Sequence, residues 1–153
     1  LRATGMARVQ MPYGDTHLAD LPDGPLVLIA AGTGMGQMHS LIEHCRAAGF
    51  SHPVHLYWGA RRPEDFYELP HWAQWQQLDN LHLHQVVSDQ CGWQGRCGLL
   101  HEAVREDFPD LKALHVYASG SPAMVYATLD ALVEAGMDAH QMRADVFAYA
   151  PRG

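Results

Sequence analysis

An apolar segment that runs directly into closely spaced glycines, at residues 25–38, constrains the fold of this chain more than any other feature. Residues 26–30 have the composition of a buried strand, and Gly32, Gly34 and Gly36 follow at its end. Apolar residues then recur at helical spacing, which predicts a strand, a tight turn and a helix. The free N–H groups at such a helix start attract phosphate, although a turn of this kind is more often a plain connection than a cofactor site.

Strand-like and helix-like segments alternate along the rest of the chain, which predicts βαβ units. We therefore expect an α/β fold with an open, doubly wound, parallel five-stranded sheet. In such a sheet, ligands bind beyond the carboxyl ends of the strands, where the strand order reverses. The expected strands are 26–30, 54–58, 81–87, 114–118 and 144–149, and helical segments are expected within 35–49, 70–78, 100–108 and 121–136.

The first 24 residues lie outside this alternation. Residues 7–11 form a short alternating segment, and turn-like or loop-like sequence follows at 12–15 and 20–25. We expect 1–24 to be the end of a preceding domain and a linker, and 25–153 to be the nucleotide-binding domain.

Charge and hydropathy exclude some classes of partner. The net charge is −7, and the ten Lys and Arg residues are scattered, so no basic surface for nucleic acid is expected. No apolar run approaches the ~18 residues of a membrane span, and no basic leader precedes an apolar stretch. We therefore expect no membrane partner and a cytoplasmic location.

The cysteines and histidines do not predict a disulfide framework or a metal site. The chain has three cysteines, and Cys91 and Cys97 lack the short C-x-x-C spacing of metal or redox pairs, so free thiols are expected. His82 and His84 alternate as in a strand, with no third ligand nearby in the sequence.

Two arginines follow the expected strand 54–58, and no acidic residue directly ends that strand. Arg61 or Arg62 would lie beside the adenosine half of a bound dinucleotide and would meet a 2′-phosphate or the adenine ring. Alternatively, both are solvated and form ion pairs with Glu64 or Asp65. The residues alone leave both interpretations open.

Two later segments are further candidates. Ser119 and Gly120 form a small-residue turn before a helix start, which suits either a second wall of a ligand cleft or a plain N-capped helix. Phe147 and Tyr149 would share one face of the expected strand 144–149, and the core is their expected place.

Four motifs occur in order along the chain: Gly-Thr-Gly at 32–34, Tyr-Trp-Gly-Ala-Arg-Arg-Pro-Glu-Asp-Phe-Tyr at 57–67, Tyr-Ala-Ser-Gly-Ser-Pro-Ala-Met at 117–124 and Ala-Asp-Val-Phe at 144–147. In this order they resemble the ferredoxin–NADP reductase-like flavoproteins, especially NAD(P)H-flavin reductases and oxygenase reductase components, including the CDP-6-deoxy-glucoseen reductase type. The resemblance runs over about 8–149, and residues 12–15 resemble the segment that joins this family's flavin barrel to its nucleotide domain.

The resemblance implies a domain that binds NADH or NADPH in an FAD- or FMN-dependent oxidoreductase. Hydride would pass to a flavin held by a barrel domain of the same polypeptide, of which 1–24 would be the end. Electrons would pass on to a free flavin, an iron–sulfur centre or an oxygenase. The implied contacts are Gly32, Thr33 and Gly34 at the pyrophosphate, Arg61 near the adenosine ribose, and Ser119, Gly120, Pro122 and Met124 around the nicotinamide, with Ser119 on the reacting side.

The chain departs from the family pattern in two ways. Ser119-Gly120 stands where many members have Cys-Gly, and the Arg-x-Tyr-Ser signature of the flavin barrel is absent, so the chain alone is expected to be inactive. A valine at Gly34 is expected to abolish nucleotide binding and leave the fold largely intact, because its side chain would fill the space of the pyrophosphate and a β-branched residue resists any turn with a positive φ. The alternative function is a non-catalytic module that senses pyridine nucleotide or docks a partner through exposed Trp72, Trp75 and Trp93.

Overall fold

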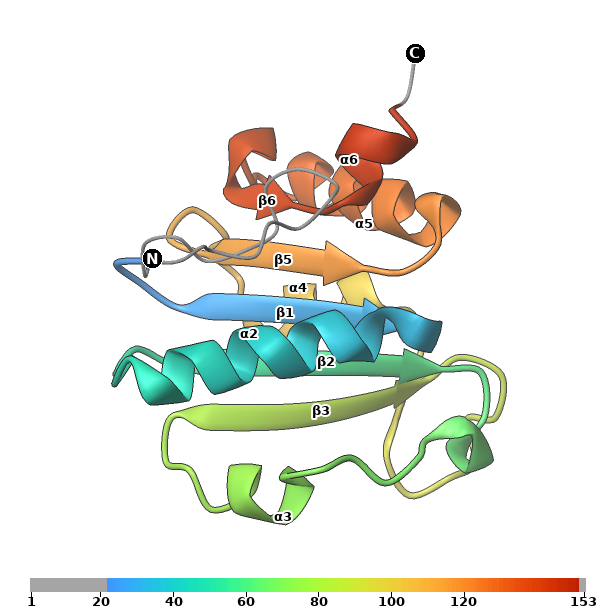
Figure 1. The fold of residues 1–153 in the computed structure, drawn as a ribbon. Coiled ribbons are helices and arrows are strands. Elements are labelled where there is room, and N and C mark those ends of the chain that lie inside the picture. The colour runs from blue at the N-terminus through green and yellow to red at the C-terminus, as the bar shows by residue number, and fades with distance from the viewer. Residues whose placement is uncertain (1–21, 152–153) are drawn as a thin grey trace.

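A six-stranded sheet is the centre of the computed structural model, which describes residues 22–151 (Figure 1). All of its strand pairings are parallel. In spatial order the strands are β4 (Arg96–Cys97), β3 (Leu81–Val87), β2 (Val54–Ala60), β1 (Leu26–Ala31), β5 (His115–Ser119) and β6 (Met142–Arg143). The strand order reverses between β1 and β5, and the carboxyl ends of these two strands therefore form the edge where such folds bind ligands.

Helices cover both faces of the sheet (Figure 1). The helices are α2 (Met35–Ala47), α3 (Trp72–Trp75), α4 (Leu100–Asp107), α5 (Pro122–Glu134) and α6 (Val146–Tyr149). One core cluster joins the sheet to α2 and α3, and a second joins its other face to α4 and α5. Ser121 caps α5 as its sequence predicts, because the Ser121 hydroxyl accepts a hydrogen bond from the backbone N–H of Met124 at 3.2 Å.

The central strand β1 is buried on both faces. Leu26 and Leu28 belong to the core under α2, whereas Val27 and Ile29 belong to the core under α4 and α5. All four side chains are 0% exposed. A strand covered on both sides has no polar face, which explains why this segment is a continuous apolar run.

The carboxyl-terminal segment differs from the expected strand at 144–149. The chain instead forms the two-residue β6 and then the short helix α6. Phe147 packs against Tyr126 with ring centroids 5.5 Å apart, but Tyr149 is 51% exposed and is not a core residue. The sheet has six strands, whereas five were expected. The prediction missed β4 and β6 because strands of two residues are too short to give a sequence signal.

A polar network lies where β2 and β4 meet the end of α4. The Tyr57 hydroxyl donates a hydrogen bond to Asp107 at 2.6 Å, and Arg96 Nη1 donates to the same carboxylate at 2.7 Å. Burial acts against ionisation here, yet the hydrogen bonds from Arg96 and Tyr57 hold the pKa of Asp107 below its usual value. The network ties three elements together through one carboxylate.

Three imidazole rings stack beside this network on the same face of β2 and β3. The ring of His55 lies 4.4 Å from that of His82 and 5.4 Å from that of His84, centroid to centroid. His55 Nδ1 and His84 Nε2 share a hydrogen bond at 3.2 Å. Burial, followed by repulsion from His82 and His84, lowers the pKa of His55 to about 4.

The expected linker at 1–24 falls almost wholly outside the described residues. Within residues 22–151, no helix is long and apolar enough to cross a membrane.

Candidate functional site

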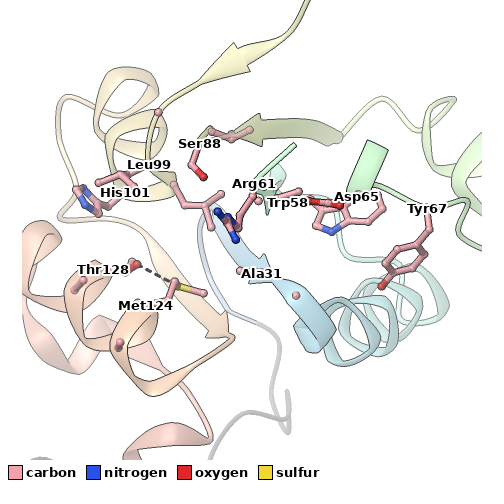
Figure 2. Close-up of a pocket in the computed structure, with 18 residues that line it drawn as sticks. Ala31, Trp58, Arg61, Asp65, Tyr67, Ser88, Leu99, His101, Met124 and Thr128 are labelled. Atoms are coloured by element: carbon pink, nitrogen blue, oxygen red, sulfur yellow. Dashed lines mark hydrogen bonds between the residues drawn. The ribbon is translucent and has the colours of Figure 1, made fainter. Parts of the chain in front are cut away.

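A cleft of about 640 Å³ opens at the carboxyl ends of β1, β2 and β3 (Figure 2). The start of α4 and the first two turns of α5 supply its other walls. Ala31, Trp58, Leu99 and Met124 make much of the lining apolar. A mostly apolar cleft with a few polar groups suits a flat aromatic ring such as adenine.

The glycine turn separates this cleft from a second cavity. The turn is a short 3-10 helix at Gly32–Gly34, and Gly32 has the positive φ, +59°. Gly34 has a φ of −65°, which any residue adopts, so backbone conformation does not require glycine at 34. Instead, a Cβ atom at Gly34 would lie within 3.0 Å of the Ser119 backbone. Glycine is required there because the β1 turn and the end of β5 are in close contact.

The amino-terminus of α2 follows the turn directly. Among the described residues, no side chain caps this helix and no acidic residue occupies its first turn. Gly36, in that first turn, has open space where a Cβ atom would point. A helix start with no capping side chain and no acidic residue leaves the helix dipole uncompensated, which makes this end attractive to an anion.

The second cavity, of about 340 Å³, lies between the ends of β5 and α6. Gly34, Ser119 and Gly120 line it together with Asp145 and Tyr149. Gln37 of α2 donates a hydrogen bond to Asp145 at 3.1 Å. Sequence reasoning missed Asp145, whose only signal was its place within the motif at 144–147.

The expected nucleotide contacts divide between these two cavities. Gly32, Arg61 and Met124 line the larger cleft, and Gly34, Ser119 and Gly120 line the smaller cavity. Thr33 contributes its backbone to the turn between them. Pro122, at the first position of α5, is exposed and lines neither. Seven of the eight residues thus meet along one edge of the sheet.

Arg61 is paired, but not with either of the expected acids. Its Nε donates to Asp89 Oδ2 at 2.9 Å, and Asp89 follows β3 instead of β2. Asp65 accepts a hydrogen bond from the backbone of Arg62. The hydrogen bonds from Arg61 and Ser88 lower the pKa of Asp89, so Asp89 is a carboxylate at neutral pH. Sequence reasoning missed Asp89 because 28 positions separate it from Arg61.

One ring nitrogen in the wall of the larger cleft lacks a partner. His101, at the start of α4, lines the cleft, and its Nδ1 is buried without a hydrogen bond to any described residue. An unpaired buried polar atom costs about 1–3 kcal/mol.

The tryptophans do not form the exposed docking surface that the alternative function needs. Trp75 is 0% exposed, and its indole N–H donates to Glu43 at 2.7 Å. Trp72 and Trp93 are half-buried. The structure contradicts the expectation that all three are exposed.

Cys91 and Cys97 also differ from their expected state as free thiols. They are joined by a disulfide, with Cα atoms 5.0 Å apart. Cys45 is a free, buried thiol, as expected. The loop between the two cysteines brings them together across a sequence separation of six residues. Short metal-binding and redox motifs have a closer spacing, so they do not predict this pair.

Comparisons with known proteins agree with this geometry. Residues 28–130 match the family of oxidoreductase NAD-binding domains. Protein RfbI of Salmonella typhimurium is 33% identical over 150 residues, which cover 96% of this chain and 44% of that protein. The NAD(P)H-flavin reductase of Vibrio harveyi is 32% identical over 154 residues, which cover 97% and 64%.

The chain also superposes on the crystal structure of the Amycolatopsis cytochrome P450 reductase GcoB, with a TM-score of 0.77 and 30% sequence identity. The superposition covers 88% of this chain and 42% of the GcoB chain.

A parallel α/β sheet with a glycine turn at its switch point defines a nucleotide-binding domain. The chain belongs to the oxidoreductase NAD-binding domain family of ferredoxin reductase-like proteins, as its four motifs predict. It spans about half the length of the curated relatives it matches.

Proposed function

We propose that this chain is the NAD(P)H-binding domain of a flavin-dependent oxidoreductase. The observation that carries the proposal is the uncapped start of α2 at the β1–β5 switch point, with an apolar cleft on one side and a small cavity on the other. The pyrophosphate would bind the N–H groups at that helix start. The adenosine would enter the larger cleft and the nicotinamide the smaller cavity.

Each wall of the site would have a separate task. Ser119 and Gly120 would orient the nicotinamide, because small residues leave room for a ring. His101 would form part of the wall against which the adenosine packs. A bound nicotinamide supplies the hydride, and a flavin held by a preceding domain accepts it. The chain's own contribution is binding and alignment of the nucleotide.

In this proposal, residues 1–24 are the end of a flavin barrel and a linker, and the protein is cytoplasmic. Its electron acceptor is a free flavin, an iron–sulfur centre or an oxygenase. The relatives support this acceptor class, because one is a flavin reductase and another a cytochrome P450 reductase. A domain that only senses pyridine nucleotide is the second candidate. Flavin reduction by the intact polypeptide, supplied with NADH, distinguishes the two.

The substitution Gly36→Asp tests the phosphate site. An acidic residue in the first turn stabilises a helix by about 0.3–1 kcal/mol, and replacing a helical glycine also helps. We therefore expect unchanged or higher stability in urea, but at least tenfold weaker NADH binding by calorimetry, because the new carboxylate repels the pyrophosphate. Gly36→Asn, which has the same shape without the charge, should bind NADH much as the wild type does. Equal NADH affinity in all three proteins would show that the nucleotide does not use this helix end.

Asp89 should favour NADH over NADPH. Its carboxylate already occupies Arg61 and would repel a 2′-phosphate. Exposed ion pairs are weak, so Asp89→Asn should improve NADPH binding by only about fivefold while NADH binding stays the same. Calorimetry with both nucleotides measures the ratio, and Glu64→Gln, on a neighbouring acid that binds neither arginine, is the matched control. A parallel change for both nucleotides would place Arg61 away from the ribose.

A further inference from the structure

The disulfide Cys91–Cys97 lies in the segment that leads from the end of β3 to the start of α4. Both cysteines are exposed, and β4 includes Cys97. The bridge closes a loop with a sequence separation of six residues. A disulfide on an exposed loop is open to attack by an external thiol, whereas a buried one is protected.

The same segment forms one wall of the larger cleft. Ser88 precedes the bridge, and Gly98 and Leu99 follow it; all three line the cleft. Asp89, which pairs with the cleft residue Arg61, lies two residues before Cys91. The bridge therefore joins the two ends of the cleft wall.

The two ends of this wall are held to the fold, because the backbone N–H groups of Ser88 and Asp89 donate to carbonyls at the end of β2, β4 pairs with β3, and Arg96 forms ion pairs with α4. Residues 90–95, between these ends, have fewer contacts with the rest of the fold. Gly98 donates a backbone hydrogen bond to Val87 at 2.9 Å, and the Trp93 indole donates to the Arg96 carbonyl at 2.7 Å. The Trp93 hydrogen bond spans three residues inside the loop, and the Trp93 ring lies 5.8 Å from that of Phe66, centroid to centroid. Opening the bridge would therefore release mainly residues 90–95 to more conformations, and binding a nucleotide against the adjoining Ser88 and Gly98 would require ordering them again.

We propose that Cys91 and Cys97 form a reversible thiol–disulfide site that sets the affinity of the adjacent cleft for its nucleotide, and that the reacting partner is a dithiol. The inference rests on the proposed function, because the ligand of the cleft is taken to be NADH. In a reducing cytoplasm, disulfides are usually transient, catalytic or redox-sensing, which fits an exposed pair beside a ligand site better than a structural bridge.

The exchange is balanced with one dithiol. A thiolate of the dithiol attacks one sulfur of the bridge, the Cys91–Cys97 bond breaks, and a mixed disulfide forms while the other cysteine leaves as a thiolate and takes up a proton. The second thiol of the reactant then attacks the mixed disulfide. The protein gains two electrons and two protons as two thiols, and the dithiol becomes a disulfide.

The test compares NADH affinity in the two redox states. Oxidised chain, chain reduced with dithiothreitol, and the double variant Cys91→Ser/Cys97→Ser are titrated with NADH by calorimetry. We expect about three- to tenfold weaker NADH binding by the reduced chain and the double variant than by the oxidised chain. Dithiothreitol should not change the double variant, and Cys45→Ala should respond to it as the wild type does.

A thiol titration of the folded chain follows the bridge itself. Burial raises the pKa of the Cys45 thiol to about 11, so Cys45 reacts slowly and the count reports on Cys91 and Cys97. Two reactive thiols should be present after reduction and none before. Equal NADH affinity in both states, or thiols that are free after mild oxidation, overturns the redox site and leaves the proposed function intact. If the oxidised chain, with its bridge formed, does not bind NADH, both the redox site and the proposed function are overturned.

Discussion

Between about pH 7 and pH 4.5 the chain is expected to lose about 2 kcal/mol of folding stability through His55. The folded state holds the pKa of His55 at about 4, whereas an unfolded histidine has a pKa near 6.5. Within that window the unfolded chain binds a proton that the folded chain excludes. The stability is therefore complete above about pH 6.5 and decreases as the pH falls towards 4. The full shift would correspond to about 3 kcal/mol, and partial exposure of the ring reduces it.

Urea unfolding at about pH 7 and pH 4.5 measures this loss. His55→Gln removes the titrating ring, so the variant should lose clearly less stability than the wild type over the same range. His140→Gln replaces a ring that is exposed and outside the stack, and it should lose as much as the wild type. Equal pH dependence in all three proteins would show that the imidazole stack is not the source.

Gly34→Val is expected to lower the free energy of unfolding by about 3 kcal/mol, since overpacking a close backbone contact is costly. The new Cβ would meet the carbonyl carbon and oxygen of Ser119, and neither backbone can move without shifting the ends of β1 and β5. The sequence-based expectation that such a variant keeps its fold is not supported by this contact. NADH binding should be lost together with stability.

Thermal or urea unfolding of Gly34→Val beside Gly36→Ala separates the two glycines. Gly36 has open space at its Cβ position, so alanine there should be neutral or stabilising. A Gly34→Val protein as stable as the wild type, with NADH binding abolished, would restore the view that a side chain at 34 only fills the phosphate site.

Local signals predicted most of the fold. The buried strand, glycine turn and helix at 25–38 were readable because burial on both faces demands a continuous apolar run. The Ser121-Pro122 start of α5 was readable because capping chemistry is local. By contrast, 144–149 looked like a strand since Val146 and Phe147 are β-prone, yet four residues are too few to distinguish a helical turn from a strand.

The parts of the site that sequence reasoning missed depend on contacts between distant segments. Arg61 and Asp89 meet because β2 and β3 end side by side, and nothing in either local sequence records the other. Asp145 reaches Gln37 across 108 positions. Residues within one motif are read together, whereas ion pairs between motifs appear only once the strands are ordered.

The parallel pairing of β1 with β5 also has a consequence during synthesis. Leu26 pairs with His115, about 90 positions further along the chain. At roughly 5–20 residues per second, a ribosome needs several seconds to make that stretch. Throughout this interval one edge of β1 has no partner, and the wall that Ser119 gives to the glycine turn does not yet exist. The nascent domain would therefore depend on a chaperone, or on early pairing of β1 with β2, to protect its most apolar strand until β5 emerges.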